Sequence, residues 1–303
     1  MNHLEITARK PWRAALMSLV LPGFGQLYNG QAEKAIWLFL GFAIVSIPMI
    51  ALAALYLPAP LMAPTLALSL LLAIGLWLGG MADAWRTARR FDNHVLKPWQ
   101  TGAAYFLTLI LCDFVGLPLL TMYMREHQVE PYRVPSTSME PSVKQGDYFF
   151  ADKRYNCAGC KSPVARGDIA LFVYPNDRTQ IYIKRIVGLP GDRIQIGDRM
   201  VAVNGKPLTT AAAPIDANGT SAEQAGARRW RVQWAAASEA APAADFTVPA
   251  GQVFVLGDNR GNSLDSRSFG TVPLADVVGK ARQVWFSTGA DGLRVERIGK
   301  VLE

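Results

Sequence analysis

The sequence predicts an α-helical membrane anchor of three transmembrane helices, followed by a mainly β domain outside the cytoplasm. Three apolar segments in the first 127 residues are long enough to cross a bilayer, which takes about 20 helical residues. After residue 127 no such segment recurs, and short β-type runs alternate with Gly-Asp and Asn-Gly turns. We therefore expect a membrane domain at residues 1–127 and a β-rich domain at residues 128–303.

The predicted spans are Ala35 to Leu57, Leu61 to Ala82 and Gly102 to Met124, and the first two contain no charged residue. Basic residues precede the first span and lie between the second and third, whereas the turn between the first two has none. By the positive-inside rule, the amino terminus and the second connection are cytoplasmic. Three crossings then place the β-rich domain on the extracytoplasmic side.

A shorter uncharged segment, residues 14–30, is interrupted by Pro22 and by glycines. Its length predicts an interfacial or re-entrant piece rather than a fourth span. Leu21 to Gly30 also resembles a Pro-Gly-x-Gly-Gln-x-Tyr-x-Gly motif of small membrane proteins of unknown role, and we assign it no function.

The net charge of +7 is spread along the chain, with 9 basic and 6 acidic residues up to His127 and 22 and 18 after it. No run of Lys and Arg with interleaved aromatic residues stands out. We therefore expect no nucleic-acid partner.

Cys157 and Cys160 lie in the expected extracytoplasmic domain, where oxidation is permitted. One such pair, without a second pair or a histidine, cannot complete a structural zinc site. We predict a small disulfide loop, in preference to metal binding or free thiols, and we expect neither a metal nor a cofactor.

The β-rich domain begins with strand-like runs that are separated by turn residues. Predicted strands are residues 148–152, 169–174 and 181–187, then a pair at 193–196 and 200–203, with order returning at 246–256. Residues 209–247 are Ala-rich and are expected to form a smaller subdomain or insertion. We expect its flanks to be loops and its Trp-containing middle, residues 228–234, to be one strand.

The histidines are His3, His94 and His127, so the β-rich domain has no base for a Ser-His-Asp triad. Lysine is the usual substitute when burial lets it lose its proton. In the strand Ile181 to Val187, Lys184 shares a face with apolar neighbours. Taken alone, this strand would ordinarily be interpreted as an edge strand with a solvent-facing lysine.

Two polar segments accompany this lysine. The loop Pro135 to Pro141 is stiffened by prolines and contains Ser136 and Ser138, which can act as a hydrogen-bond donor and an attacking hydroxyl. The segment Gly257 to Arg267 is dense in Asp, Asn, Ser and Arg, and its charges can pair and hold a site rigid.

Four segments resemble, in order, the conserved boxes of bacterial type I signal peptidases. They are Pro135 to Pro141 (Ser-x-Ser-Met-x-Pro), Gly167 to Phe172, Tyr182 to Asp192, and Gly257 to Arg267 (Gly-Asp-Asn-Arg followed by Ser-x-Asp-Ser-Arg). All four fall within residues 131–270 in the family's order, which is far less probable by chance than any single match. The resemblance implies a catalytic domain with the signal peptidase or Ser-Lys protease β-fold, periplasmic, on a multi-pass protein of the bacterial cytoplasmic (inner) membrane.

By that resemblance, Ser138 is the nucleophile and Lys184 its general base. The Ser136 hydroxyl and the Ser138 backbone N–H form the oxyanion hole, and Ser263 orients Lys184. The implied supporting ion pairs are Asp265 with Arg267 and Arg185 with Asp258. The implied substrate-binding residues are Val134, Pro135, Met139, Val143, Tyr182 and Ile183.

The family's activity is an endopeptidase reaction that removes amino-terminal signal peptides after an Ala-x-Ala motif. The implied partners are therefore preprotein signal peptides, which the membrane lipid brings to the enzyme. This chain departs from the family at Thr137, where Gly is commoner, and in having three spans rather than one or two.

The sequence is also compatible with other functions. A conjugative pilin-maturing peptidase and a self-cleaving Ser/Lys regulator use the same dyad, although the regulator's Ala-Gly or Cys-Gly cleavage bond does not precede Ser138 here. A non-enzymatic alternative is an inactive membrane-anchored β scaffold.

Overall fold

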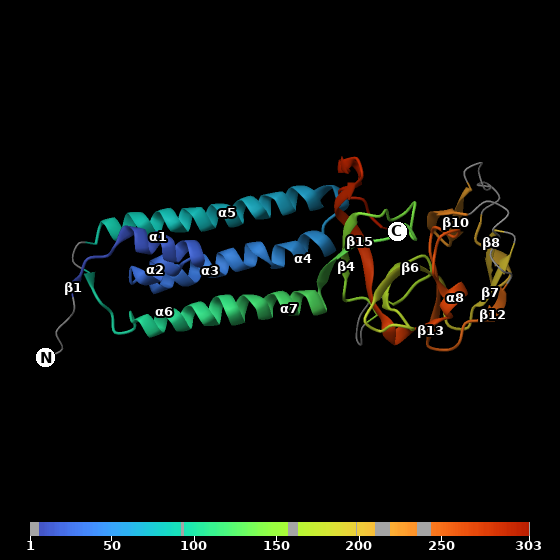
Figure 1. Ribbon diagram of the computed structural model, residues 1–303, viewed down its shortest axis with the longest axis horizontal. Coiled ribbons are helices and arrows are strands. Elements are labelled where there is room, and N and C mark those ends of the chain that lie inside the picture. The colour runs from blue at the N-terminus through green and yellow to red at the C-terminus, as the bar shows by residue number, and fades with distance from the viewer. Residues whose placement is uncertain are drawn as a thin grey trace. The chain divides into compact units, whose positions relative to one another are not determined.

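The computed structural model describes residues 6–91, 94–156, 163–197, 199–209, 219–234 and 244–302. The chain divides into two compact units, Met1–Glu126 and His127–Glu303. The first is helical and the second is mainly β (Figure 1). Cys157 and Cys160, and residues 210–218 and 235–243 of the Ala-rich segment, lie outside the described residues.

The helical unit consists of helices of 5 to 31 residues and a small strand pair. Its elements are β1 (Ile6–Thr7), α1 (Pro11–Val20), α2 (Phe24–Tyr28), α3 (Ala32–Ser46), α4 (Pro48–Leu55), α5 (Ala59–Arg89), β2 (His94–Val95), α6 (Gly102–Leu109), the π-helix η1 (Ile110–Gly116) and α7 (Leu117–His127). Strands β1 and β2 pair in antiparallel fashion.

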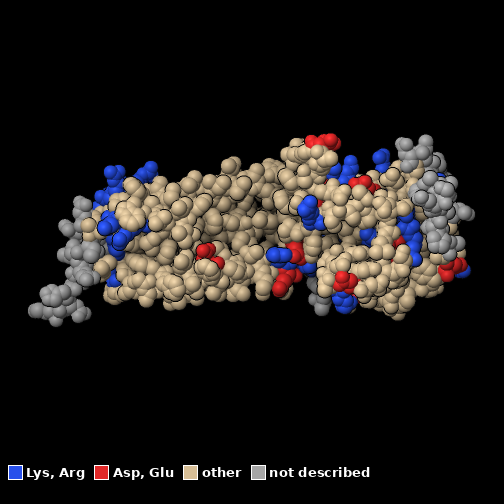
Figure 2. All heavy atoms as spheres, viewed as in Figure 1, with Lys and Arg blue, Asp and Glu red and all other residues tan. Residues whose placement is uncertain are grey.

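Three helical segments in the described part of the chain are long and apolar enough to cross a membrane: Ala32–Leu55, Pro60–Arg89 and Gly102–His127. They overlap the three predicted spans. The first begins earlier and ends at Leu55 rather than Leu57, and the second and third extend past their predicted ends to Arg89 and His127. Basic side chains gather at one end of this unit, where α5 ends with Arg86 and Arg89 (Figure 2).

The residues of the Leu21 to Gly30 motif pack closely against the neighbouring helices. Helix α1 has ten residues and α2 has five, so neither is long enough to cross a bilayer. Gly25 has no room for a side chain, because a Cβ there would lie 2.1 Å from the Ala14 carbonyl oxygen. Gln26 and Asn29 donate to the carbonyls of Gly80 and Ala84 on α5, at 2.7 and 2.9 Å. The motif therefore joins α2 to α5.

The β unit is built on one large curled sheet with the strand order β14-β13-β6-β5-β15-β4-β3. These strands are β3 (Val129–Arg133), β4 (Asp147–Asp152), β5 (Ile169–Val173), β6 (Ile181–Gly188), β13 (Gln252–Leu256), β14 (Val272–Pro273) and β15 (Val277–Gly289), to which β16 (Gly292–Leu293) is added. Short helices follow at α8 (Ser266–Phe269), η3 (Leu274–Asp276) and η4 (Val295–Arg297).

A smaller sheet has the order β12-β7-β8-β9, formed by β7 (Arg193–Gly197), β8 (Met200–Val203), β9 (Lys206–Pro207) and β12 (Ala244–Thr247). The predicted strand pair at 193–196 and 200–203 is confirmed by the β7–β8 register. Strands β10 (Thr220–Ala225) and β11 (Arg228–Gln233) form a separate hairpin. The expected loop at 220–225 was therefore wrong. Alternate side chains of β10 are buried there despite its Ala-rich composition.

Strand β6 lies between β5 and β13, and its second half is buried throughout. Lys184 lies in this buried half, so the interpretation of Lys184 as a solvent-facing lysine is excluded. Apolar clusters pack on the strands around it, one containing Ile169 and Leu171 and another containing Phe172 and Ile186. The lysine thus projects from a rigid, dehydrated part of the sheet.

Candidate active site

The loop that carries Ser138 connects β3 to β4 and is fixed by backbone hydrogen bonds. Val134 N–H donates to the Asp147 carbonyl and Gly146 N–H donates to the Val134 carbonyl, each at 2.9 Å. Met139, the residue after Ser138, is fully buried in the core of the sheet. Because Met139 anchors the loop, the Ser138 side chain has a defined position.

Lys184 and Ser138 meet across the loop and the sheet. The Lys184 Nζ and Ser138 Oγ atoms are 2.7 Å apart and hydrogen-bonded. The lysine is only 4% exposed and the serine 8%. The Tyr182 ring centre lies 5.6 Å from Nζ, as expected for residues that share a face of the strand.

Burial lowers the pKa of Lys184 from its ordinary value of 10.5 to about 8. An ammonium group loses its hydration there, which favours the neutral amine. The carboxylates of Asp265 and Asp258 act in the opposite direction and keep the pKa from falling further. The amine is therefore poised to lose a proton close to neutral pH.

Ser136 lies beside this pair, with its hydroxyl 3.2 Å from the Ser138 hydroxyl. Its hydroxyl is thus close enough to donate to an oxygen on a carbon atom placed against the Ser138 hydroxyl. Such a donor suits the stabilisation of a developing oxyanion.

A cavity of about 690 Å³ opens at the Ser138 and Lys184 side chains. Its walls come from the Ser138 loop, from the first half of β6 and from the segment after β13. They are Pro135, Ser136, Thr137, Ser138, Gln145, Gln180, Ile181, Tyr182, Ile183, Lys184, Asn262 and Leu264. Of the predicted substrate-binding residues, Pro135, Tyr182 and Ile183 line this cavity, whereas Val134, Met139 and Val143 lie in the core cluster behind the loop.

Both expected ion pairs are formed. Arg185 donates to Asp258 through Nε at 2.8 Å and Nη2 at 2.7 Å, with both side chains fully buried. Arg267 makes an equivalent two-pronged contact with Asp265, with both distances 2.8 Å. Burial alone would raise the pKa of Asp265, but hydrogen bonding and attraction to Arg267 bring it below the usual value.

Ser263 lies against Gly257, where an added Cβ would be 2.1 Å from its hydroxyl. Its Oγ is buried, and among the described residues it makes no hydrogen bond to the Lys184 amine. An orienting role for Ser263 stays a prediction.

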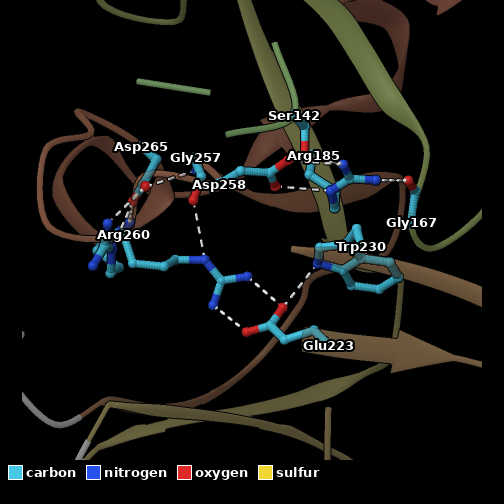
Figure 3. A network of polar contacts seen from close by, with 10 residues as sticks. Ser142, Gly167, Arg185, Glu223, Trp230, Gly257, Asp258, Arg260 and Asp265 are labelled. Carbon is cyan, nitrogen blue, oxygen red and sulfur yellow. Dashed lines mark hydrogen bonds and ion pairs between the residues drawn. The ribbon is translucent and has the colours of Figure 1, made fainter. Parts of the chain in front are cut away.

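Sequence reasoning missed the contacts that Glu223 makes. This residue of β10 is fully buried and bonds both to Arg260 and to the indole of Trp230 (Figure 3). The only local signal was the pairing of a carboxylate with a tryptophan across a short hairpin. Within the described parts of the chain, no group of three or more His, Cys, Asp or Glu residues is placed to hold a metal ion.

A sequence profile of the family described as "Signal peptidase, peptidase S26" matches residues 106–286. A signal peptidase I from Pseudomonas fluorescens is 33% identical over 203 residues, which cover 58% of this chain and 71% of that protein. One from Rickettsia typhi is 32% identical over 214 residues, covering 60% and 78%. A solved signal peptidase I from Enterococcus faecalis is 33% identical and covers 39% of this chain and 97% of that one, with a TM-score of 0.27.

The range matched by the profile includes Ser138, Lys184 and the segment from Gly257 to Arg267. It begins inside the third candidate span, so the first two candidate spans lie outside it.

Proposed function

Because the chain belongs to the signal peptidase family, peptidase S26, we propose that it removes signal peptides from exported preproteins as a Ser/Lys endopeptidase. The observation that carries this proposal is the hydrogen bond between a buried lysine amine and a serine hydroxyl at the end of an open cavity. Ser138 is the nucleophile in this proposal and Lys184 its general base.

In the reactive state the Lys184 amine is neutral and accepts the Ser138 proton as Oγ attacks the scissile carbonyl carbon. The Ser136 hydroxyl and the Ser138 backbone N–H stabilise the oxyanion that forms. The resulting Lys184 ammonium gives its proton to the leaving amine as the peptide bond breaks. A water molecule, deprotonated by the same amine, then hydrolyses the acyl-enzyme and releases the signal peptide.

The lowered pKa makes this chemistry practicable near neutral pH. With a pKa of about 8, about a quarter of the molecules carry a neutral Lys184 at pH 7.5. With the ordinary value of 10.5 the neutral fraction would be only about 0.1%. Burial therefore raises the concentration of the reactive form by more than a hundredfold.

The cavity suits an extended peptide. Strand β6 pairs with β5 over Ile181 to Arg185, but in the described structure its pairing with β13 begins only at Arg185. The other edge of Ile181 to Lys184 is thus left for a substrate strand, and these residues line the cavity. Main-chain pairing gives affinity without reading sequence, and small pockets at alternate positions favour Ala-x-Ala before the cleaved bond.

We further propose that the three candidate spans hold the protein in the bacterial inner membrane with its amino terminus in the cytoplasm. The basic end of the helical unit supports this orientation through the positive-inside rule. In spheroplasts, an external protease should then digest the β unit and leave the helical unit protected. Protection of the β unit would contradict this topology.

The full chain in detergent, incubated with a preprotein carrying an Ala-x-Ala site, tests the function directly, with the cut located by mass spectrometry. We expect one cut after the second Ala, its loss in Ser138→Ala, and full activity in the matched control Ser268→Ala, which changes an exposed serine. A cut within the chain itself would favour the self-cleaving alternative. No cut in any substrate would favour the inactive scaffold.

A further inference from the structure

Strand β10 contributes a buried carboxylate to the region behind the active site. Glu223 is 0% exposed and accepts hydrogen bonds from Arg260 through Nη1 at 2.6 Å and Nη2 at 2.5 Å. The indole N–H of Trp230, directly opposite on β11, donates to the same carboxylate at 3.0 Å. The carboxylate is thus bonded through both oxygens, and its hairpin holds one end of Arg260 fixed.

The guanidinium group of Arg260 is also bonded to the backbone of the loop that follows β13, to which Arg260 belongs. Its Nε donates to the Gly257 carbonyl at 3.0 Å, and Gly257 N–H donates to Asp265 at 2.9 Å (Figure 3). Gly257 also lies against the nucleophile, since an added Cβ would be 2.5 Å from the Ser138 carbonyl oxygen. One chain of contacts therefore runs from Glu223 through Arg260 and Gly257 to Ser138.

A second connection runs through the backbone. Gln233, the last residue of β11, donates its N–H to the Asp258 carbonyl at 2.8 Å. The next residue of the loop, Asn259, donates its N–H to the Ser138 carbonyl at 3.1 Å. The peptide group between Asp258 and Asn259 is thus bonded to the hairpin through its carbonyl and to the backbone of the nucleophile through its N–H.

The hairpin also reaches the lysine side of the dyad. The Trp230 ring lies against the Arg185 guanidinium, 4.9 Å from its centroid. Arg185 follows Lys184 in β6 and makes a two-pronged ion pair with Asp258. The Asp258 carboxylate is one of those that raise the pKa of Lys184. Both members of the dyad therefore adjoin residues that the β10–β11 hairpin contacts.

We propose that Glu223 is a positioning residue for the dyad, acting through Arg260 and the Gly257–Asn259 loop. The inference rests on the proposed function. A buried ion pair contributes little net stability compared with apolar residues of similar size, so stability alone does not explain it. Fixing the loop that touches Ser138 gives the pair a catalytic consequence, because small displacements of a nucleophile slow the reaction strongly.

The test compares Glu223→Gln with the double variant Glu223→Met/Arg260→Met in cleavage of the Ala-x-Ala preprotein. For both we expect kcat to fall about 10- to 100-fold with KM within about threefold of the wild type. The double variant has no unpaired buried charge, so it should melt within a few degrees of the wild type. A double variant with wild-type melting and a kcat within about threefold would overturn the proposal.

The matched control is Arg193→Met/Asp245→Met, which removes an exposed two-pronged pair of the neighbouring sheet and should leave kcat unchanged. If both Glu223 variants fail to fold, Trp230→Phe removes the N–H donated to Glu223 together with part of the buried indole ring, and it should lower kcat about 3- to 10-fold. An unchanged kcat in that variant would also overturn the proposal. A wild type that cuts no preprotein would contradict the proposed function instead.

Discussion

The Lys184 amine lies 2.7 Å from the Ser138 hydroxyl, at a point where both side chains are almost fully buried. Water cannot solvate an ammonium group there, whereas two buried carboxylates, Asp265 and Asp258, attract it. The balance leaves the pKa of Lys184 at about 8. The same burial that lowers the pKa of Lys184 therefore destabilises the folded protein, and both effects can be measured.

The first prediction concerns the pH dependence of cleavage. Only the neutral Lys184 amine accepts the proton, so kcat/KM should rise about tenfold per pH unit below its pKa of about 8 and level off above it. The substrate should be a preprotein-derived peptide without titratable groups near the cut, so that only groups of the enzyme contribute to the pH profile. A flat profile between pH 6 and 10 would exclude Lys184 as the base.

Replacing the lysine should stabilise the protein. The fall in the pKa from 10.5 to about 8 means that the buried ammonium group lowers the free energy of unfolding by about 3 kcal/mol at pH 7. Methionine removes this cost but also loses the hydrogen bond to Ser138, which contributes about 1 kcal/mol. Lys184→Met should thus be inactive and about 2 kcal/mol more stable to denaturant at pH 7.

The sign of this effect with pH is fixed by linkage. The folded protein binds fewer protons than the unfolded chain between pH 8 and 10.5, so wild-type stability rises with pH through that window. The advantage of Lys184→Met should shrink over the same window. An advantage that is constant with pH would contradict the lowered pKa.

Removing a carboxylate near Lys184 should shift the low-pH part of the curve of kcat/KM against pH. Asp265 raises the pKa of Lys184, so Asp265→Asn should move the midpoint of kcat/KM to lower pH while lowering the maximum. The control Asp245→Asn, in an exposed ion pair, should leave the midpoint in place. A midpoint that moves to higher pH would show that water, rather than the carboxylate, governs the amine.

Gly257 packs so closely against Ser138 and Ser263 that no larger side chain fits at this position. In Gly257→Ala the new methyl group would lie 2.1 Å from the Ser263 hydroxyl and 2.5 Å from the Ser138 carbonyl oxygen, so the loop must shift. We expect kcat to fall about a hundredfold or more. Gly197→Ala, whose new methyl has no atom of the described residues within 4 Å, is the matched control and should cleave at the wild-type rate. Equal rates for both variants would show that the loop tolerates displacement.

Local patterns predicted much of this arrangement. The three candidate spans follow from apolar length, and the strand that carries Lys184 follows from the apolar residues on both sides of Lys184 and Arg185. The loop around Ser138 was recognised by its prolines and serines. Neighbouring residues predict each span and strand, whereas the site residues were identified by four segments in the family's order and not by any single one.

The contacts of Glu223 could not be predicted in this way. Its partner Arg260 is 37 residues away, and the strand between Thr220 and Ala225 consists mainly of polar residues and alanine, a composition that does not favour a strand, while glutamate is seldom buried. Similarly, Val134, Met139 and Val143 lie in the core because of how the β3–β4 loop folds back on the sheet. Such relationships depend on tertiary packing and appear only in three dimensions.

The pKa of Lys184 is the quantity on which the mechanism depends, and NMR titration can measure it directly. The full chain in detergent, labelled with ¹³C at lysine Cε, would be compared with Lys184→Met to assign the signal. We predict a titration midpoint near 8. A midpoint near the ordinary value of 10.5 would contradict the proposed base and the mechanism derived from it.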